Sequence, residues 1–147
     1  MKIRDMDWGQ LEAYCVTLLR QALQDDIWRI QSQADRPERD GLNQRMDFHI
    51  AEHQHDGLGY VIACKHYPDK VVSQEDIEQV LAYKRLCHAS GVILLLSTVT
   101  RWTQDFPALS HAHGIEVVTI DLLGFPGVLQ WIAHQISEVS QQRSIQR

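Results

Sequence analysis

Hydrophobic residues along the first third of the chain are spaced first as in a helix and then as in strands. Apolar positions recur every three to four residues between about 7 and 24, which predicts a helix, and Asp7 with Gln10 matches a capping box at its start. Shorter apolar runs near 27–30, 44–52 and 58–66 are typical of strands. The Asp-Gly pair before the last run indicates a hairpin, whereas residues 32–43 have the composition of a charged loop.

The rest of the chain alternates between helix and strand patterns. Helices are predicted over about 74–89, 104–113 and 126–139, the first of them capped by Ser73, and strands over about 92–96 and 115–120. The run at 92–96 is entirely apolar, which is typical of a central strand buried on both faces. The order αβββαβαβα predicts an α/β fold, a mixed sheet flanked by helices on both faces. We expect a single domain over 1–140 and a frayed polar tail over 141–147.

Composition narrows the class of protein. The 147 residues include 44% hydrophobic and 22% charged residues, typical of a soluble globular domain. No apolar stretch reaches the roughly 20 residues that span a bilayer, and the N-terminus lacks a signal-peptide core, so we expect no membrane association. The three cysteines fall in predicted buried elements and are interpreted as reduced core residues of a cytoplasmic protein. A net charge of −5 argues against a generic polyanion binder.

Lys65 ends the apolar run at 58–66, and a lysine there is costly unless its ammonium is paired or hydrated. Strand alternation puts Ala63 and Lys65 on one face, and Asp47 on the matching face of the preceding strand. A carboxylate that holds Mg²⁺ beside a lysine that orients water is the chemistry of phosphodiester hydrolysis. The structural alternatives are an edge aspartate and a lysine that snorkels at a strand end.

Two helical positions add candidates. Glu12 borders the apolar face of the first helix, where a carboxylate should be hydrogen-bonded or metal-linked, although a first-turn glutamate is also favoured by the helix dipole. Gln79 and Tyr83 lie four apart on one helical face after the lysine strand. Their structural alternative is a solvent-side glutamine above a half-buried tyrosine.

The order of Asp47, Lys65 and Gln79-x-x-x-Tyr83 resembles the PD-(D/E)xK nuclease superfamily. The segments at 64–67, 90–98, 102–103 and 114–118 are similar to the Mrr-type (type IV restriction) nuclease domain, and the likeness covers about residues 8–123. This resemblance implies a restriction-endonuclease-like fold, DNA as the partner, Mg²⁺ or Mn²⁺ as the cofactor, and a homodimer, since two cuts need two sites. It makes Asp47 the metal ligand, Lys65 the catalytic lysine and Glu12 the supporting acid.

Ala63 departs from the family pattern, which has an acid or glutamine two positions before the lysine. Three explanations compete: the acid was replaced deliberately, the natural protein lost activity, or the acid migrated to the following helix. On that helix Glu75 lies one turn before Gln79, whereas Glu78 is rotated by about 100°. Glu75 is therefore the better geometric substitute, although a plain first-turn role is favoured for it.

Weaker signals are the three histidines at 49, 53 and 55 and the three arginines at 36, 39 and 45. The histidines are interpreted as surface residues rather than a zinc site, and the arginines as part of a solvated loop, because acidic residues interleave with them. Two hypotheses result. The first is a Mg²⁺-dependent DNA endonuclease with Asp47, Lys65, Glu12 and Gln79 around the position of Ala63. The second is a catalytically silent domain of the same fold that binds nucleic acid or protein.

Overall fold

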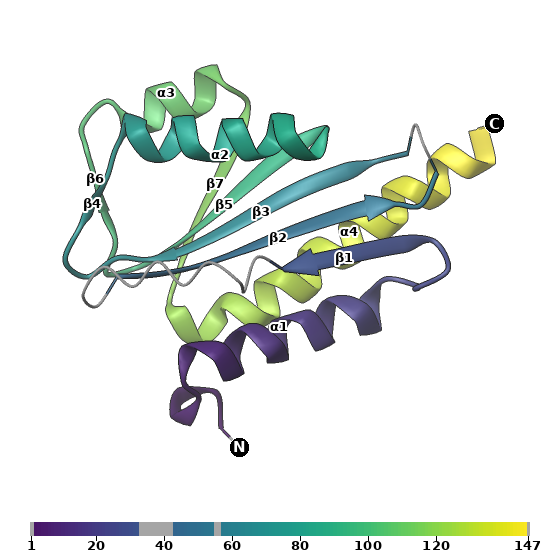
Figure 1. Ribbon diagram of the computed structural model, residues 1–147, viewed down its shortest axis with the longest axis horizontal. Helices are drawn as coiled ribbons and strands as arrows, with labels where there is room; N and C mark the ends of the chain where they lie inside the picture. The colour runs from purple at the N-terminus through teal and green to yellow at the C-terminus, as the bar shows by residue number, and fades with distance from the viewer. Residues whose placement is uncertain (1, 33–42, 55–56, 147) are drawn as a thin grey trace.

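The computed structural model describes residues 2–32, 43–54 and 57–146. In this part of the chain, five strands form a mixed sheet in the order β1-β2-β3-β5-β7. The strands are β1 (Trp28–Ser32), β2 (Gln44–Glu52), β3 (Gly59–His66), β5 (Gly91–Ser97) and β7 (Ile115–Ile120). The first three pair antiparallel, whereas β3, β5 and β7 run parallel because a helix connects each to the next (Figure 1).

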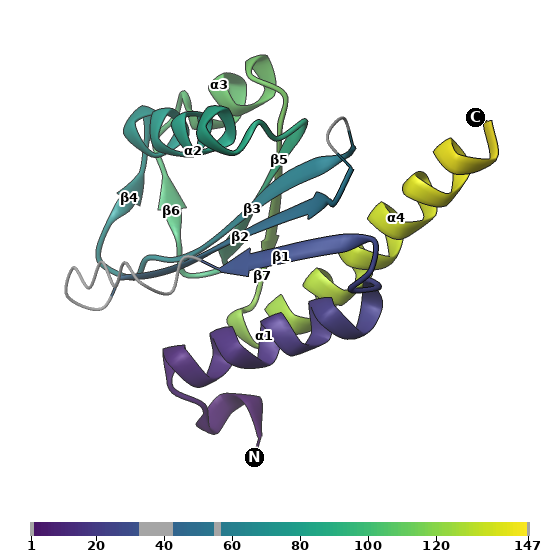
Figure 2. The same ribbon diagram turned by 45° about the vertical axis from the view of Figure 1, so that its right-hand side comes forward.

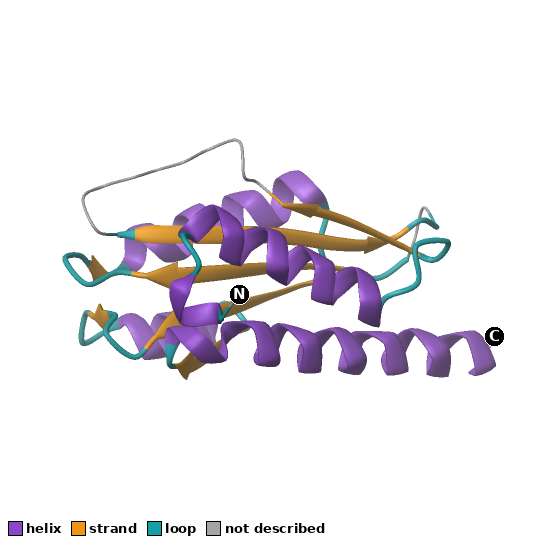
Figure 3. Cartoon of the chain, turned by 90° about the horizontal axis from the view of Figure 1, so that it is seen from below, coloured by secondary structure: helices purple, strands orange, loops and turns teal. Residues whose placement is uncertain are grey.

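Four helices cover the two faces of the sheet in the described residues. One face carries α1 (Trp8–Ala22) and α4 (Phe125–Gln146), and the other carries α2 (Gln74–Cys87) and α3 (Phe106–Ala112) (Figures 1 and 2). Helices α1 and α4 contact each other along the sheet, and the C-terminal end of α4 extends past it (Figure 3). The structure also contains two short parallel strands, β4 (Val71–Val72) and β6 (Arg101–Trp102), and the 3₁₀ turns η1 (Ile3–Asp5) and η2 (Leu122–Gly124).

Helix α1 begins where the sequence predicts. The Asp7 carboxylate accepts the Gln10 backbone N–H at 2.7 Å, and the Gln10 side-chain oxygen accepts the Asp7 N–H at 3.0 Å, which completes the capping box. The buried residues Leu11, Cys15 and Leu19 recur at helical spacing and pack against the sheet. The local sequence therefore fixes both the start of α1 and the face that it buries.

Two hydrophobic cores lie on opposite faces of the sheet. On the side of α1 and α4, the buried strand residues are Trp28, Met46, Phe48, Ile50, Ile62, Cys64 and Leu95. On the side of α2 and α3, they are Val61, Ala63, Val92, Leu94, Leu96 and Ile115. Strand β5 contributes to both cores because successive side chains point to opposite faces. Its burial on both faces confirms the prediction made from the run at 92–96.

The α/β fold class and its element order are confirmed, with two differences. Helix α4 continues to Gln146, so the expected frayed tail is wrong over 141–146. The short strands β4 and β6 were not predicted, because two-residue strands carry no periodicity. The loop at 33–42 and Asp56 of the expected hairpin turn lie outside the described residues. None of the described helices has the length and apolar character needed to cross a bilayer.

Candidate active site

The pairing of β2 with β3 determines which candidate residues share a face. In this antiparallel ladder Asp47 lies opposite Ala63, and Arg45 lies opposite Lys65. Directly opposed residues point to the same face, so all four side chains lie on the side of the sheet that α2 covers. The predicted convergence of Asp47, position 63 and Lys65 on one face therefore follows from the register.

Lys65 is buried along its whole length, with 2% of its surface exposed. Its Nζ lies 3.6 Å from Oδ1 of Asp76 and donates a hydrogen bond to the Tyr67 hydroxyl at 3.2 Å. The ammonium also lies 5.1 Å from the centre of the Tyr67 ring. The snorkelling alternative is therefore wrong, because the charge is paired inside the protein and does not reach solvent.

Asp76, the partner of Lys65, was missed by the sequence reasoning. It is the third residue of α2 and 3% exposed, and its Oδ2 accepts the Ser73 backbone N–H at 2.9 Å. Glu75 and Glu78, which were considered as acids on this helix, are both exposed. The signal was present, because Ser73-x-x-Asp76 is a capping-box pattern and Asp76 lies one turn before the buried residue Val80.

Asp47 and Arg45 are half-buried neighbours on β2. Arg45 Nε lies 3.6 Å from Asp47 Oδ2, and Arg45 Nη1 donates to the side-chain oxygen of Gln79 at 3.3 Å. Gln79 on α2 is thus joined to this group through Arg45, while Tyr83, one turn later, is half-buried. The interpretation of Arg45 as part of a solvated loop is wrong, because Arg45 belongs to β2 and its side chain is only 14% exposed.

Glu12 approaches from the other face of the sheet. Trp8, one turn before it on α1, donates its indole N–H to the Arg45 carbonyl at 2.9 Å. Burial raises the pKa of the Cys64 thiol on this face, and the charges of Asp47 and Glu12 both raise it further. In the described residues β1 pairs with β2 only over 48–52. Asp47 itself is not among the β2 residues that pair with β1 there.

Ala63 is enclosed by the core on the α2 side, where only 1% of its surface is exposed. Ile77 and Val80 of α2 belong to the same buried cluster. An acidic side chain at position 63 would therefore enter a buried hydrophobic cluster and not open solvent.

His49 is on the same face as Asp47 and is 6% exposed, so its interpretation as a surface histidine is wrong. Burial lowers the pKa of His49, and the charge of Arg29 lowers it further. His53 is exposed, with its ring Nε2 2.8 Å from the Asp25 carbonyl oxygen, and His55 lies outside the described residues. Across the described chain, no three histidine, cysteine, aspartate or glutamate side chains form a metal-binding group, so no zinc site is found there.

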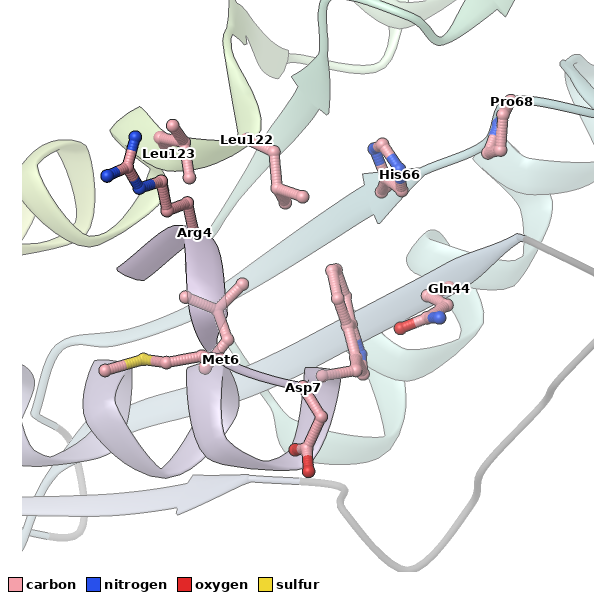
Figure 4. Close-up of a pocket in the computed structure, with 10 residues that line it drawn as sticks. Arg4, Met6, Asp7, Gln44, His66, Pro68, Leu122 and Leu123 are labelled. Atoms are coloured by element: carbon pink, nitrogen blue, oxygen red, sulfur yellow. The ribbon is translucent and has the colours of Figure 1, made fainter. Parts of the chain in front are cut away.

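A pocket of about 660 Å³ opens at the same strand end on the opposite face (Figure 4). It lies between Gln44 and His66 of the β2–β3 ladder and the side chains of Arg4, Met6 and Leu122. The His66 ring stacks against that of Trp8 at 6.3 Å, and its Nδ1 lies 2.9 Å from the Ser97 hydroxyl. This pocket was not predicted, and none of the predicted site residues lines it.

A mixed five-stranded sheet with an aspartate and a lysine on one face of a central hairpin is the arrangement expected of a restriction-endonuclease-like domain. The model of the Mrr_cat family, described as restriction endonuclease, matches residues 3–124. The chain therefore belongs to this family, as the resemblance in its sequence implied.

Among solved structures, the chain is similar to the DNA modification-dependent restriction endonuclease AspBHI, at 14% sequence identity and a TM-score of 0.42. The match covers 99% of this chain and 37% of the AspBHI chain, so this chain spans little more than a third of that enzyme. No curated protein matches the sequence.

Proposed function

We propose that the chain is a divalent-metal-dependent DNA nuclease domain whose activity is weak because position 63 carries no acid. The observation that carries this proposal is the β2–β3 register, in which Asp47 and Lys65 share a face beside position 63. Membership of the restriction endonuclease family supports phosphodiester hydrolysis as the reaction. We further propose that the active form is a homodimer, since cutting both strands needs two sites.

The donor set fits a weakly held Mg²⁺ or Mn²⁺ better than a preformed metal cage. No group of three metal-binding side chains is present in the described residues. Mg²⁺, however, is commonly held by one or two carboxylates, with water and substrate phosphate completing its shell. Asp47 would be the principal ligand and Glu12 the supporting acid at the sheet edge. Ala63 supplies no oxygen, so we expect metal affinity to depend on bound DNA.

The other residues of the site would have separate roles in the proposed reaction. A bound Mg²⁺ would polarise the scissile phosphate and acidify its water. The ammonium of Lys65 would stabilise the negative charge that develops on the phosphate. Gln79 would hold the Arg45 guanidinium, to which it already bonds at 3.3 Å, and Arg45 in turn would orient the Asp47 carboxylate.

A plasmid-nicking assay in Mg²⁺ or Mn²⁺ tests this proposal. We expect slow nicking by the natural sequence, faster nicking by Ala63→Glu where circular dichroism confirms that it is folded, and loss of both on adding Asp47→Asn. Lys65→Met keeps the aliphatic stem and removes the charge, so it should also abolish nicking. The proposal fails when neither the natural chain nor a folded Ala63→Glu form cuts DNA in either metal.

The buried ion pair of Lys65 with Asp76 favours a second candidate function, a catalytically silent domain that binds nucleic acid or a partner protein. A lysine that is already neutralised inside the protein is not presented to a phosphate. In this case a gel shift should detect DNA binding that needs no metal, weakens steeply with salt and leaves the DNA intact. An absence of any nucleic-acid binding would leave only the protein partner.

A further inference from the structure

We infer that Asp76 is the positioning residue of the candidate site: its carboxylate fixes the Lys65 ammonium beneath α2. This inference rests on the proposed role of Lys65 as the site lysine. In this role, the first turn of α2 controls the direction of the Lys65 ammonium and its accessibility to a phosphate.

The contacts make Asp76 the anchor and Lys65 the group that is anchored. One carboxylate oxygen of Asp76 accepts the Ser73 backbone N–H at 2.9 Å, so the side chain is tied to the start of its own helix. Its other oxygen is 3.6 Å from Lys65 Nζ. A lysine side chain has four rotatable bonds, whereas an aspartate held by its own backbone has little freedom left. The helix therefore determines where the ammonium lies.

Because Lys65 is buried, its ammonium needs the negative charge of Asp76 as a countercharge. The side chains of Lys65 and Asp76 are each only 3% exposed, and removing one partner of such a pair leaves an uncompensated charge inside the protein. The Tyr67 hydroxyl, which accepts a bond from Nζ at 3.2 Å, contributes a dipole but no countercharge. Without the carboxylate of Asp76, the ammonium should leave the interior for solvent, toward the face that carries Asp47.

Lysine-specific acylation measures this movement directly. The chain has lysines at 2, 65, 70 and 84, and limited labelling with an N-hydroxysuccinimidyl acetate, followed by peptide mass spectrometry, gives the rate at each. In the natural protein Lys65 should react far more slowly than Lys70, which is exposed. Asp76→Asn should raise the rate at Lys65 relative to Lys70 by about tenfold, because local exposure controls the reaction.

Asp76→Asn is chosen because asparagine keeps an oxygen that can accept the Ser73 N–H and removes only the charge. Asp76→Glu should preserve most of the protection, since it restores the charge. The matched control is Asp105→Asn, which makes the same exchange at the start of α3, where Asp105 is exposed. This control should leave the rate at Lys65 unchanged. Equal protection of Lys65 in the natural protein and in folded Asp76→Asn would overturn the inference.

A double variant covers the case in which Asp76→Asn does not fold. If Asp76 acts through Lys65, the loss of its charge should matter less once Lys65→Met has removed the ammonium. The Lys65→Met/Asp76→Asn double variant should then show a cooperative urea unfolding transition that Asp76→Asn alone lacks. A double variant that is also unfolded means that Asp76 acts only within its own helix, and the inference is wrong. Neither measurement uses DNA or metal, so both can be read even if the nuclease proposal fails.

Discussion

Asp47 of β2 lies directly opposite Ala63 of β3 in the antiparallel ladder, so the two side chains point to the same face of the sheet. The two positions differ in environment, because Asp47 is half-buried whereas Ala63 is enclosed in the core beneath α2. An acid introduced at position 63 must therefore fit into this core as well as supply a carboxylate.

Ala63→Glu should lower the free energy of unfolding by at least about 2 kcal/mol, because it overpacks a core position and buries a carboxylate. Urea unfolding followed by circular dichroism measures the loss. The matched control is Ala82→Glu, the same exchange at an exposed position of α2, which should stay within about 0.5 kcal/mol of the natural protein. Equal midpoints for the two variants would mean that α2 does not close over position 63.

His66 should make the fold less stable as the pH falls. Burial lowers the pKa of His66 below its ordinary value of 6.5, and the charge of Asp121 opposes part of this shift. Below about pH 6.5 the unfolded chain takes up the proton first, so stability falls until the pH reaches the lowered pKa of the folded state. Above that window the imidazole is neutral in both states and has no effect.

The measurement for His66 is a set of urea unfolding curves between about pH 7.5 and about pH 5, the range in which an imidazole titrates. His66→Gln should show a shallower loss of stability over this range than the natural protein. His113→Gln exchanges an exposed histidine and serves as the control with an unchanged slope. A slope that His66→Gln leaves intact would assign the pH dependence to other groups.

The three cysteines, all free thiols, should differ in reactivity. Burial raises the pKa of Cys15 to about 12 and that of Cys64 well above its usual range, so neither forms the reactive thiolate near pH 8. Cys87 is only half-buried, and burial raises its pKa as well. With Ellman's reagent Cys87 should react first, and Cys15 and Cys64 only after denaturant is added. Cys87→Ser should remove the early phase, and early labelling that survives this exchange would contradict the assignment.

Leu94 and Leu95 test whether both faces of β5 support the fold. Both are fully buried, Leu94 in the core beneath α2 and Leu95 in the core beneath α1 and α4. Each Leu→Ala exchange should cost about 2–5 kcal/mol in urea unfolding. Leu86→Ala, at a position that is 72% exposed, is the control and should cost less than about 0.5 kcal/mol. A small effect at either buried position would mean that its core repacks.

The sequence predicts the fold well because most of its helices and strands carry a strong local signal of their own. The capping box at Asp7, the apolar run at 92–96 and the helical spacing after Ser73 each specify an element without help from distant residues. Strand alternation also gives the shared face of Asp47 and Lys65. The extension of α4 to Gln146 was missed, because its last residues are polar and carry no apolar periodicity.

The candidate site is less predictable because its contacts join residues from separate elements. The partner of Lys65 depends on how α2 crosses β3, which no spacing within one element reveals, and so Asp76 was overlooked in favour of Glu75 and Glu78. The burial of His49 likewise depends on long-range packing. The roles of Asp47, Glu12, Lys65 and Gln79 in cleavage remain predictions for the nicking assay.

The antiparallel pairing of β2 with β3 has a kinetic consequence. Asp47 and Lys65 are joined by a hairpin, whereas β5 and β7 reach the sheet only through helical crossovers. Loops between near neighbours in sequence close faster than long ones, so hairpin contacts should form ahead of the parallel pairs. The two residues of the candidate site would then be aligned early in folding, and the docking of α2 would add Asp76 later.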